Sequence, residues 1–234
     1  QGLTPVPPPQ HRIEMNAHPS PTRNRWFFAV GTLGRDMVYA LVAMFLIFFV
    51  TDILDLPDET VLWANWLLLA ARLFDAVTDI IMGGIVDNTR TRWGQFKPWI
   101  GAGAVASGLL TLLLFSDLGV RGGAYVALFA VSYLLWSLAY TMNDIPYWSM
   151  LPSLSLDQTE RERTGALARI FATIGLFTVV VGVIPITNAL GGDATAWTIF
   201  AAGAVAVMLA GQAVTLLGVR EPRLTVEQDH TSLR

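Results

Sequence analysis

The sequence contains no cysteine, and this absence excludes disulfide bonds, thiolate metal sites and cysteine nucleophiles. Charged residues are also scarce, at 14% of the chain against about 25% in soluble proteins. This composition argues against a water-soluble globular fold. The formal net charge of −3 lacks the basic excess of nucleic-acid-binding proteins, so we expect no nucleic-acid partner.

Hydrophobic residues are abundant, at 53% of the 234 residues, and they gather in six runs separated by polar or glycine-containing breaks. A helix needs about 20 residues to cross the hydrocarbon core of a bilayer, and each run is about that long or longer. The sequence therefore predicts an all-α membrane protein embedded in a lipid bilayer. The six expected transmembrane helices cover residues 26–50, 60–86, 98–116, 123–151, 165–187 and 196–218.

The flanking and connecting segments predict the orientation of these helices. Eleven of the 15 Lys and Arg residues lie in the two flanks and in the second and fourth connections, whereas the other connections contain only Arg121. Positively charged loops stay in the cytoplasm, so we expect both termini there, in a multi-pass protein of the cytoplasmic (inner) cell membrane. We expect residues 1–25 to form a disordered cytoplasmic tail, 26–220 the bundle, and 221–234 a cytoplasmic tail or the start of a central loop.

Two short internal similarities indicate two three-helix repeats. Residues 35–39 in the first span (RDMVY) resemble residues 143–147 in the fourth (NDIPY). Residues 71–74 in the second span (ARLF) resemble residues 168–171 in the fifth (ARIF). Repeats of this kind are common in secondary transporters.

Charged residues inside the expected spans are the first functional signal. An ionised group at mid-membrane costs about 2.5–3.5 kcal/mol, so these side chains must face one another or water. Their charges sum to −1, which one bound Na⁺ or H⁺ would neutralise. The seven residues are Arg35, Asp36, Arg72, Asp75, Asp79, Asp144 and Arg169.

The second span places four polar side chains on one helix face. At about 100° per residue, Arg72, Asp75, Thr78 and Asp79 fall within about 120° of one another. Two carboxylates one turn apart repel unless a cation lies between them or one is protonated. Oxygen ligands from Asp75, Asp79 and Thr78 suit a hard cation such as Na⁺, whereas a protonated carboxylate would suit H⁺. The alternative is a network of ion pairs that only positions helices.

The fourth span carries a second polar face, made of Tyr140, Thr141, Asp144 and Trp148. A carboxylate accepts hydrogen bonds from sugar hydroxyls, while the C–H face of a pyranose packs on an aromatic ring. This pairing favours a sugar site. The alternative places Trp148 in the interfacial belt of aromatic residues, where membrane tryptophans are common. We assign five other tryptophans to that belt: Trp26, Trp63, Trp66, Trp99 and Trp197.

Several longer stretches resemble the glycoside-pentoside-hexuronide:cation symporters of the major facilitator superfamily. The resemblance covers essentially residues 26–220. It implies the N-terminal half of a major facilitator fold and cation-coupled symport of a sugar or glycoside. The stretches that carry it are residues 34–36, 71–79, 83–87, 89–99 and 144–149.

The family resemblance also implies roles for individual residues. Asp75, Asp79 and Thr141 would form the coupling-cation site for Na⁺, Li⁺ or H⁺, with Thr78 beside them at a position that is often asparagine in the family. No organic cofactor is implied. Sugar contacts would come from Arg35, Asp36, Tyr140, Asp144, Trp148 and Arg169.

The expected cytoplasmic loop between the second and third spans resembles the superfamily's Gly-x-x-x-Asp-basic signature. An acid at a helix end that faces arginines can form a breakable contact that closes one side of a transporter. The alternative is that these cations only fix the topology. The residues expected to act in gating or structure are Arg72, Gly83, Asp87, Arg90, Arg92 and Lys97.

Three other interpretations differ in function or partner. Residues 71–87 faintly resemble the metal-binding signature of CDP-alcohol phosphotransferases, but Leu68 and Thr91 stand where acids are expected, so we expect no enzyme. A carrier of another solute, such as a lipid, would share the fold. Family members have twelve helices, so this chain would act with a second six-helix half or a second copy, or would be a truncated, non-transporting partner.

Overall fold

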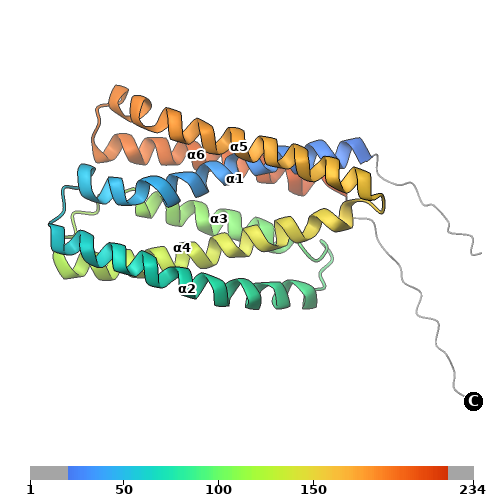
Figure 1. Ribbon diagram of the computed structural model, residues 1–234, viewed down its shortest axis with the longest axis horizontal. Coiled ribbons are helices and arrows are strands. Elements are labelled where there is room, and N and C mark those ends of the chain that lie inside the picture. The colour runs from blue at the N-terminus through green and yellow to red at the C-terminus, as the bar shows by residue number, and fades with distance from the viewer. Residues whose placement is uncertain (1–20, 221–234) are drawn as a thin grey trace, which may run out of the picture.

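A computed structural model describes residues 21–220, and the expected tails at residues 1–20 and 221–234 lie outside the described residues. The described part is a bundle of six long α-helices (Figure 1), and each expected span coincides with one of them. The elements are α1 (Pro21–Phe48), a π-helical turn η1 (Phe49–Ile53), α2 (Asp58–Asn88), α3 (Lys97–Leu114), α4 (Gly122–Met150), a 3₁₀ turn η2 (Leu151–Leu154), α5 (Gln158–Ala189) and α6 (Ala194–Gly218).

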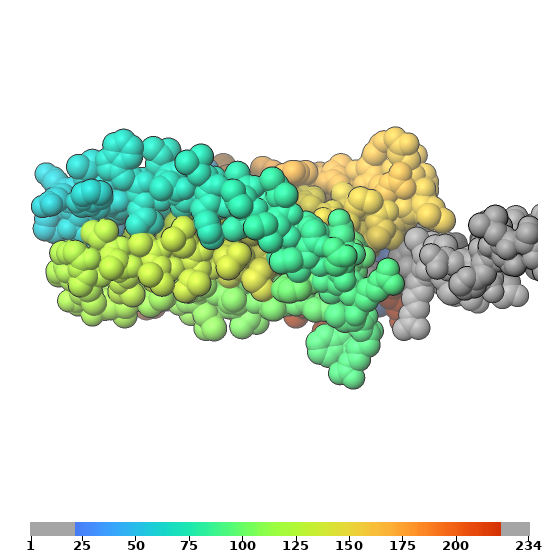
Figure 2. Space-filling view, turned by 90° about the horizontal axis from the view of Figure 1, so that it is seen from below, coloured from blue at the N-terminus to red at the C-terminus, as the bar shows by residue number. Residues whose placement is uncertain are grey.

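Within the described residues, five of the six helices are long and apolar enough to cross a membrane. The exception is α2, which has 31 residues but carries Arg72, Asp75 and Asp79 near its middle. These charges interrupt its apolar character. Helix α2 nevertheless lies beside α4 along the bundle, as Figure 2 shows, and the two aspartates face a cavity rather than hydrocarbon.

The packing of the helices matches the expected two repeats. Helix α1 packs against α5 and α6, while α4 packs against α2 and α3, and α3 meets α6. If α1–α3 are exchanged with α4–α6, the same pattern of contacts results. The described chain ends lie at the same end of the bundle as the α2–α3 and α4–α5 connections (Figure 1). Hydrogen bonds between Asn24 and the backbone of Arg220 tie those ends together.

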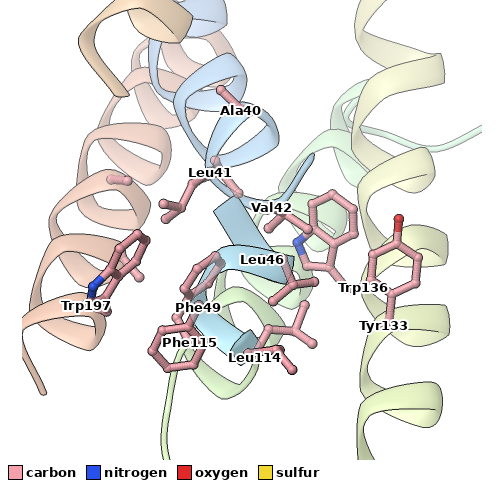
Figure 3. Packing of buried hydrophobic residues seen from close by; sticks show 14 of the residues in the cluster. Ala40, Leu41, Val42, Leu46, Phe49, Leu114, Phe115, Tyr133, Trp136 and Trp197 are labelled. Carbon is pink, nitrogen blue, oxygen red and sulfur yellow. The ribbon is translucent and has the colours of Figure 1, made fainter. Parts of the chain in front are cut away.

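Aromatic and aliphatic side chains fill the core at the opposite end of the bundle (Figure 3). The rings of Phe115 and Trp197 stack with 6.1 Å between centroids, and Phe49 packs 5.2 Å from Phe115. The expectation that Trp197 belongs to an interfacial belt is wrong, because this side chain is only 1% exposed. Trp197 packs against four aromatic rings, those of Phe45, Phe48, Phe49 and Phe115, instead of lipid headgroups.

Two glycines allow α1 to pack closely against α6 and α5 next to Arg35. A Cβ atom on Gly34 would lie 2.3 Å from the backbone nitrogen of Met208 in α6. A Cβ atom on Gly175 of α5 would lie 2.1 Å from the carbonyl oxygen of Leu33. Real Cβ atoms do not come so near to backbone, so any side chain at either position would push the helices apart.

Candidate functional site

A cavity of about 370 Å³ opens between α1, α2 and α4, within the range of small-molecule sites in proteins. Its wall combines carboxylates, hydroxyls and aromatic rings. The lining residues are Tyr39, Ala43, Arg72, Asp75, Ala76, Asp79, Tyr133, Trp136, Ser137, Tyr140, Thr141 and Asp144.

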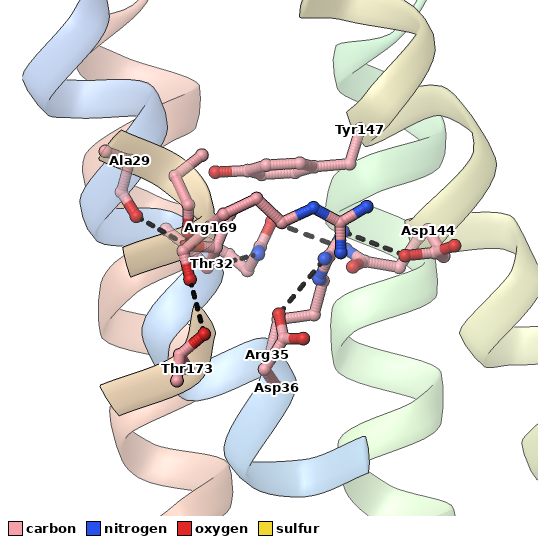
Figure 4. Close-up of polar contacts among 12 residues, drawn as sticks. Ala29, Thr32, Arg35, Asp36, Asp144, Tyr147, Arg169 and Thr173 are labelled. Carbon is pink, nitrogen blue, oxygen red and sulfur yellow. Dashed lines mark hydrogen bonds and ion pairs between the residues drawn. The ribbon is translucent and has the colours of Figure 1, made fainter. Parts of the chain in front are cut away.

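Arg35 of α1 is the most enclosed charge at the edge of this cavity, with 2% of its side chain exposed. Its guanidinium lies 2.9 Å from the Asp144 carboxylate of α4 and 3.1 Å from the carboxylate of Asp36, as Figure 4 shows. A buried arginine needs such partners to offset the loss of hydration. Because the Asp144 side chain remains 32% exposed, it can still accept further hydrogen bonds.

Trp148 lies one turn beyond Asp144 on α4 and contacts two arginines. The guanidinium carbon of Arg169, from α5, lies 4.6 Å from the centre of the Trp148 ring. That of Arg35 lies 5.0 Å from the same ring and 4.9 Å from the ring of Tyr147. Cations over aromatic faces are stabilised by the ring quadrupole. The structure thus brings together side chains of α1, α4 and α5 that the sequence grouped as one sugar site (Figure 4).

Helices α2 and α4 run side by side and are joined by two hydroxyl–carboxylate hydrogen bonds. Thr141 donates to Asp79 over 3.0 Å, and Ser137, one turn earlier, donates to Asp75. Both pairs are 62 residues apart in sequence, as expected for two parallel helices in register. Each carboxylate keeps one oxygen free of a hydroxyl partner, and both aspartates line the cavity.

The other two residues expected on this face of α2 are placed differently. The hydroxyl of Thr78 donates to the carbonyl oxygens of Phe74 and Asp75 in its own helix, and Thr78 is not among the cavity-lining residues. Arg72 lies 3.9 Å from Asp75 with 56% of its side chain exposed. Such an exposed pair contributes little to stability, so the guanidinium can change partners at little cost.

Six lining residues were not predicted from sequence: the alanines Ala43 and Ala76, and the polar or aromatic residues Tyr39, Tyr133, Trp136 and Ser137. On α4 a signal did exist, because Tyr133, Ser137, Thr141 and Asp144 follow one helix face at spacings of four, four and three. Tyr140 stacks on Trp136 at 5.3 Å between centroids and lies 5.4 Å from Tyr39 of α1. The cavity therefore has an aromatic wall beside its acidic one.

Except for Arg72, which lines the cavity, the residues expected to act in gating or structure lie toward the end of the bundle that carries both described chain ends. Gly83, Asp87, Arg90 and Arg92 are partly or fully exposed. Among residues 21–220, no ion pair joins Asp87 to a cation. Lys97 instead donates to the carbonyl oxygens of Leu216 and Val219, at 3.0 and 2.7 Å.

The chemistry of the cavity suits two kinds of ligand. Carboxylates beside indole and phenol rings can hold a polyhydroxylated ring. Two carboxylates with adjacent hydroxyl oxygens can hold a hard monovalent cation. In the described part of the chain, no cluster of three or more His, Cys, Asp or Glu residues offers a multidentate metal site, so a cation here would also need hydroxyl, water or substrate oxygens.

Comparison with known proteins assigns the sequence to a transporter family. The family model described as "MFS/sugar transport protein" matches residues 27–233. A lactose permease of Lactobacillus delbrueckii subsp. bulgaricus is 31% identical over 220 residues, which cover 88% of this chain and 35% of that protein. A raffinose carrier protein of Pediococcus pentosaceus is 32% identical over 213 residues, covering 84% of this chain and 33% of the carrier.

A third relative is named as a cation symporter. This putative glycoside/cation symporter, YagG of Escherichia coli, is 31% identical over 169 residues, or 71% of this chain and 36% of that protein. The chain thus spans about a third of the length of the curated relatives it matches. Their names describe permeases, carriers and symporters, which confirms the expectation that the chain is not an enzyme.

Proposed function

The chain belongs to the MFS/sugar transport protein family, and from that membership we propose that it forms the N-terminal half of a cation-coupled sugar or glycoside symporter. Transport would be secondary active, driven by Na⁺, Li⁺ or H⁺ across the cytoplasmic membrane. The described chain is a multi-pass membrane protein with apolar helices. The substrate and the coupling ion enter the same cavity in this proposal.

The observation that carries the proposal is the Arg35–Asp144 ion pair at the edge of a cavity with aromatic walls. Charged side chains inside a membrane protein are costly to bury, so they usually pair with one another and mark functional sites. Here the pair presents Asp144 to the cavity and keeps Trp148 alongside. Asp144 would accept hydroxyl hydrogen bonds while Tyr140 or Trp148 packs against the sugar ring. Arg35, Asp36 and Arg169 would orient these groups.

The coupling cation would bind between α2 and α4. Asp75 and Asp79 each accept one hydroxyl from α4, so a cation that neutralises them would also draw the two helices together. Thr141 lies one turn before Asp144 and its neighbours on α4, which gives a short mechanical path from the ion to the sugar. The cation would thereby favour the conformation that binds sugar, and sugar would favour cation binding by the same factor.

The exposed apolar surface of this bundle supports a proposed partner of six more helices. Helix α2 exposes Leu73 at 77% and Ile80 at 79%, and α5 exposes Phe177 at 64%. These apolar side chains need lipid or another helix against them. The matched segment covers only 35% and 33% of two of the relatives, so most of each relative lies outside it. We propose that a second half closes the cavity from the side that α2 and α5 flank.

The direct test is uptake by the full-length gene product in sealed proteoliposomes. An inward Na⁺, Li⁺ or H⁺ gradient should drive accumulation of one labelled galactoside, pentoside or glucuronide from a panel. Accumulation that no gradient changes would contradict symport. Transport of a labelled phospholipid but of no sugar would favour the lipid carrier, and no transport of either class would favour a non-transporting partner.

A further inference from the structure

A second concave site lies at the end of the bundle that carries both described chain ends, away from the cavity. It is a groove of about 930 Å³ between the α2–α3 connection, the first turns of α3 and the last turn of α6. It shares no lining residue with the cavity. Figure 2 shows the green α2–α3 connection projecting from the body of the bundle.

The rim of this groove is basic. Arg92, Lys97 and Arg220 line it, and no acidic residue does. Within residues 21–220, no ion pair is found for any of these three cations. The rim is also ordered, because Asn24 holds the backbone of Arg220 and Lys97 is bonded to the end of α6.

The rest of the groove is apolar and follows the helices. Its wall includes Ala102 of α3 and Leu217 of α6, and Leu217 is 83% exposed. Beside the rim, Trp93 is 63% exposed, with the Arg92 guanidinium carbon 5.2 Å from its ring centre. An exposed tryptophan beside cations is typical of the level of lipid headgroups. The groove thus combines cations from the α2–α3 connection, the start of α3 and the chain just after α6 with an apolar wall from the first turns of α3 and the last turn of α6.

We propose that this groove binds an anionic phospholipid, with the phosphate between Arg92 and Arg220 and an acyl chain along Ala102 and Leu217. Guanidinium groups bind phosphate oxygens in bidentate fashion. Basic pockets between membrane helices bind anionic headgroups. A free phosphate would use only the rim and leave the apolar wall uncovered. The inference does not depend on the transport function, because the groove and the cavity share no lining residue.

Lipid binding can be measured on the purified full chain by native mass spectrometry. The chain is titrated in detergent with dioleoylphosphatidylglycerol or dioleoylphosphatidylcholine. Each cation near an anionic headgroup contributes about fivefold to affinity. The variant Arg92→Gln/Arg220→Gln should therefore bind phosphatidylglycerol roughly 30-fold more weakly, with little change for phosphatidylcholine. Lys97 is left intact because it holds the end of α6.

Two further variants make the result specific. Arg163→Gln removes an exposed cation that pairs with Glu160 over 3.2 Å, outside the groove, and should leave phosphatidylglycerol affinity unchanged. Ala102→Trp fills the apolar wall without changing charge and should weaken phosphatidylglycerol binding several-fold. Melting temperatures near that of the wild type show that each variant is folded.

Three results would overturn the proposal. The first is unchanged phosphatidylglycerol affinity in Arg92→Gln/Arg220→Gln. The second is an equal loss in Arg163→Gln, which would indicate general surface charge. The third is full displacement by millimolar inorganic phosphate with no effect of Ala102→Trp, which would indicate a phosphate site alone.

Discussion

The carboxylate of Asp144 lies 2.9 Å from the guanidinium of Arg35, so the ion pair joins the two sequence stretches that resemble each other between the repeats. Arg35 belongs to α1 and Asp144 to α4, the two helices that occupy equivalent places in the packing. In the proposed sugar site, a hydroxyl that binds Asp144 would compete with Arg35 for the same carboxylate oxygens. Substrate binding would then be coupled to the separation of α1 and α4.

Replacement of Asp144 by asparagine should abolish measurable sugar binding. The amide substitutes a donor for one acceptor and removes charge-assisted hydrogen bonds worth about 1.5–3 kcal/mol each. Equilibrium binding to membranes that contain the full-length gene product measures the effect. The control is Asp117→Asn in the α3–α4 connection, where ion pairing with Arg121 and a hydrogen bond from the Gly119 backbone lower the pKa of Asp117 to about 2. Unchanged binding in Asp144→Asn would leave this residue a purely structural role.

The approach of α1 to α6 should depend on Gly34. A Cβ atom there would lie 2.3 Å from the Met208 backbone, so Gly34→Ala should separate the helices and destabilise the bundle by about 1–3 kcal/mol. Gly203→Ala is the matched control on α6, since its Cβ atom would meet nothing within 4 Å. Thermal unfolding of the purified chain compares the two. An equal melting temperature in Gly34→Ala and the wild type would show that the close approach is unnecessary.

The sequence predicts the six helices because long apolar runs in a membrane have few alternatives to a helix. It also predicts that Asp75 and Asp79 share a face, since helical periodicity alone determines this. It does not predict that α1 packs between α5 and α6. That arrangement depends on close contacts at Gly34 and Gly175, which no local pattern distinguishes from other glycines.

The parts of the site that could not be predicted involve partners distant in sequence. The hydrogen bond from Ser137 to Asp75 requires the register of α2 against α4, which periodicity within one helix does not supply. Thr78 shows that periodicity can also predict a site residue that the structure does not place in the cavity lining. It shares the helix face of Asp75, but its hydroxyl donates to backbone carbonyls of its own helix, a local hydrogen bond that threonine often makes inside helices.

The orientation predicted from loop charge can be tested by cysteine labelling, since the chain has no native cysteine. Thr91→Cys lies in the α2–α3 connection and Thr195→Cys near the start of α6, and both positions are exposed. In right-side-out vesicles, an impermeant thiol reagent should label Thr195→Cys and not Thr91→Cys. The reverse pattern would invert the topology. Labelling of both sites after permeabilisation confirms that each cysteine is reactive.

Neutralising either aspartate of α2 should uncouple sugar from the cation. Asp75→Asn and Asp79→Asn each remove a negative charge that the bound cation would neutralise, so Na⁺, Li⁺ or H⁺ should no longer raise sugar affinity. Uphill uptake should stop, while downhill exchange persists at a reduced rate. Sugar affinity is measured against cation concentration in wild type and both variants. Full cation stimulation in one variant would remove that aspartate from the proposed site.

Two threonines distinguish a cation site from a network that only holds helices together. Thr141 donates its hydroxyl to Asp79 across the cavity wall, whereas Thr78 donates to carbonyl oxygens of its own helix. Both are 7% exposed, so Thr141→Ala and Thr78→Ala remove the same atoms from equally buried positions. If the cavity binds the cation, Thr141→Ala should weaken cation stimulation of sugar binding about tenfold, the effect of losing roughly 1.4 kcal/mol. Thr78→Ala should change it much less. If both variants weaken cation stimulation equally, Thr78 is a cation ligand, as expected from the sequence. If both lower the melting temperature equally and leave cation stimulation intact, the two hydroxyls serve helix packing only.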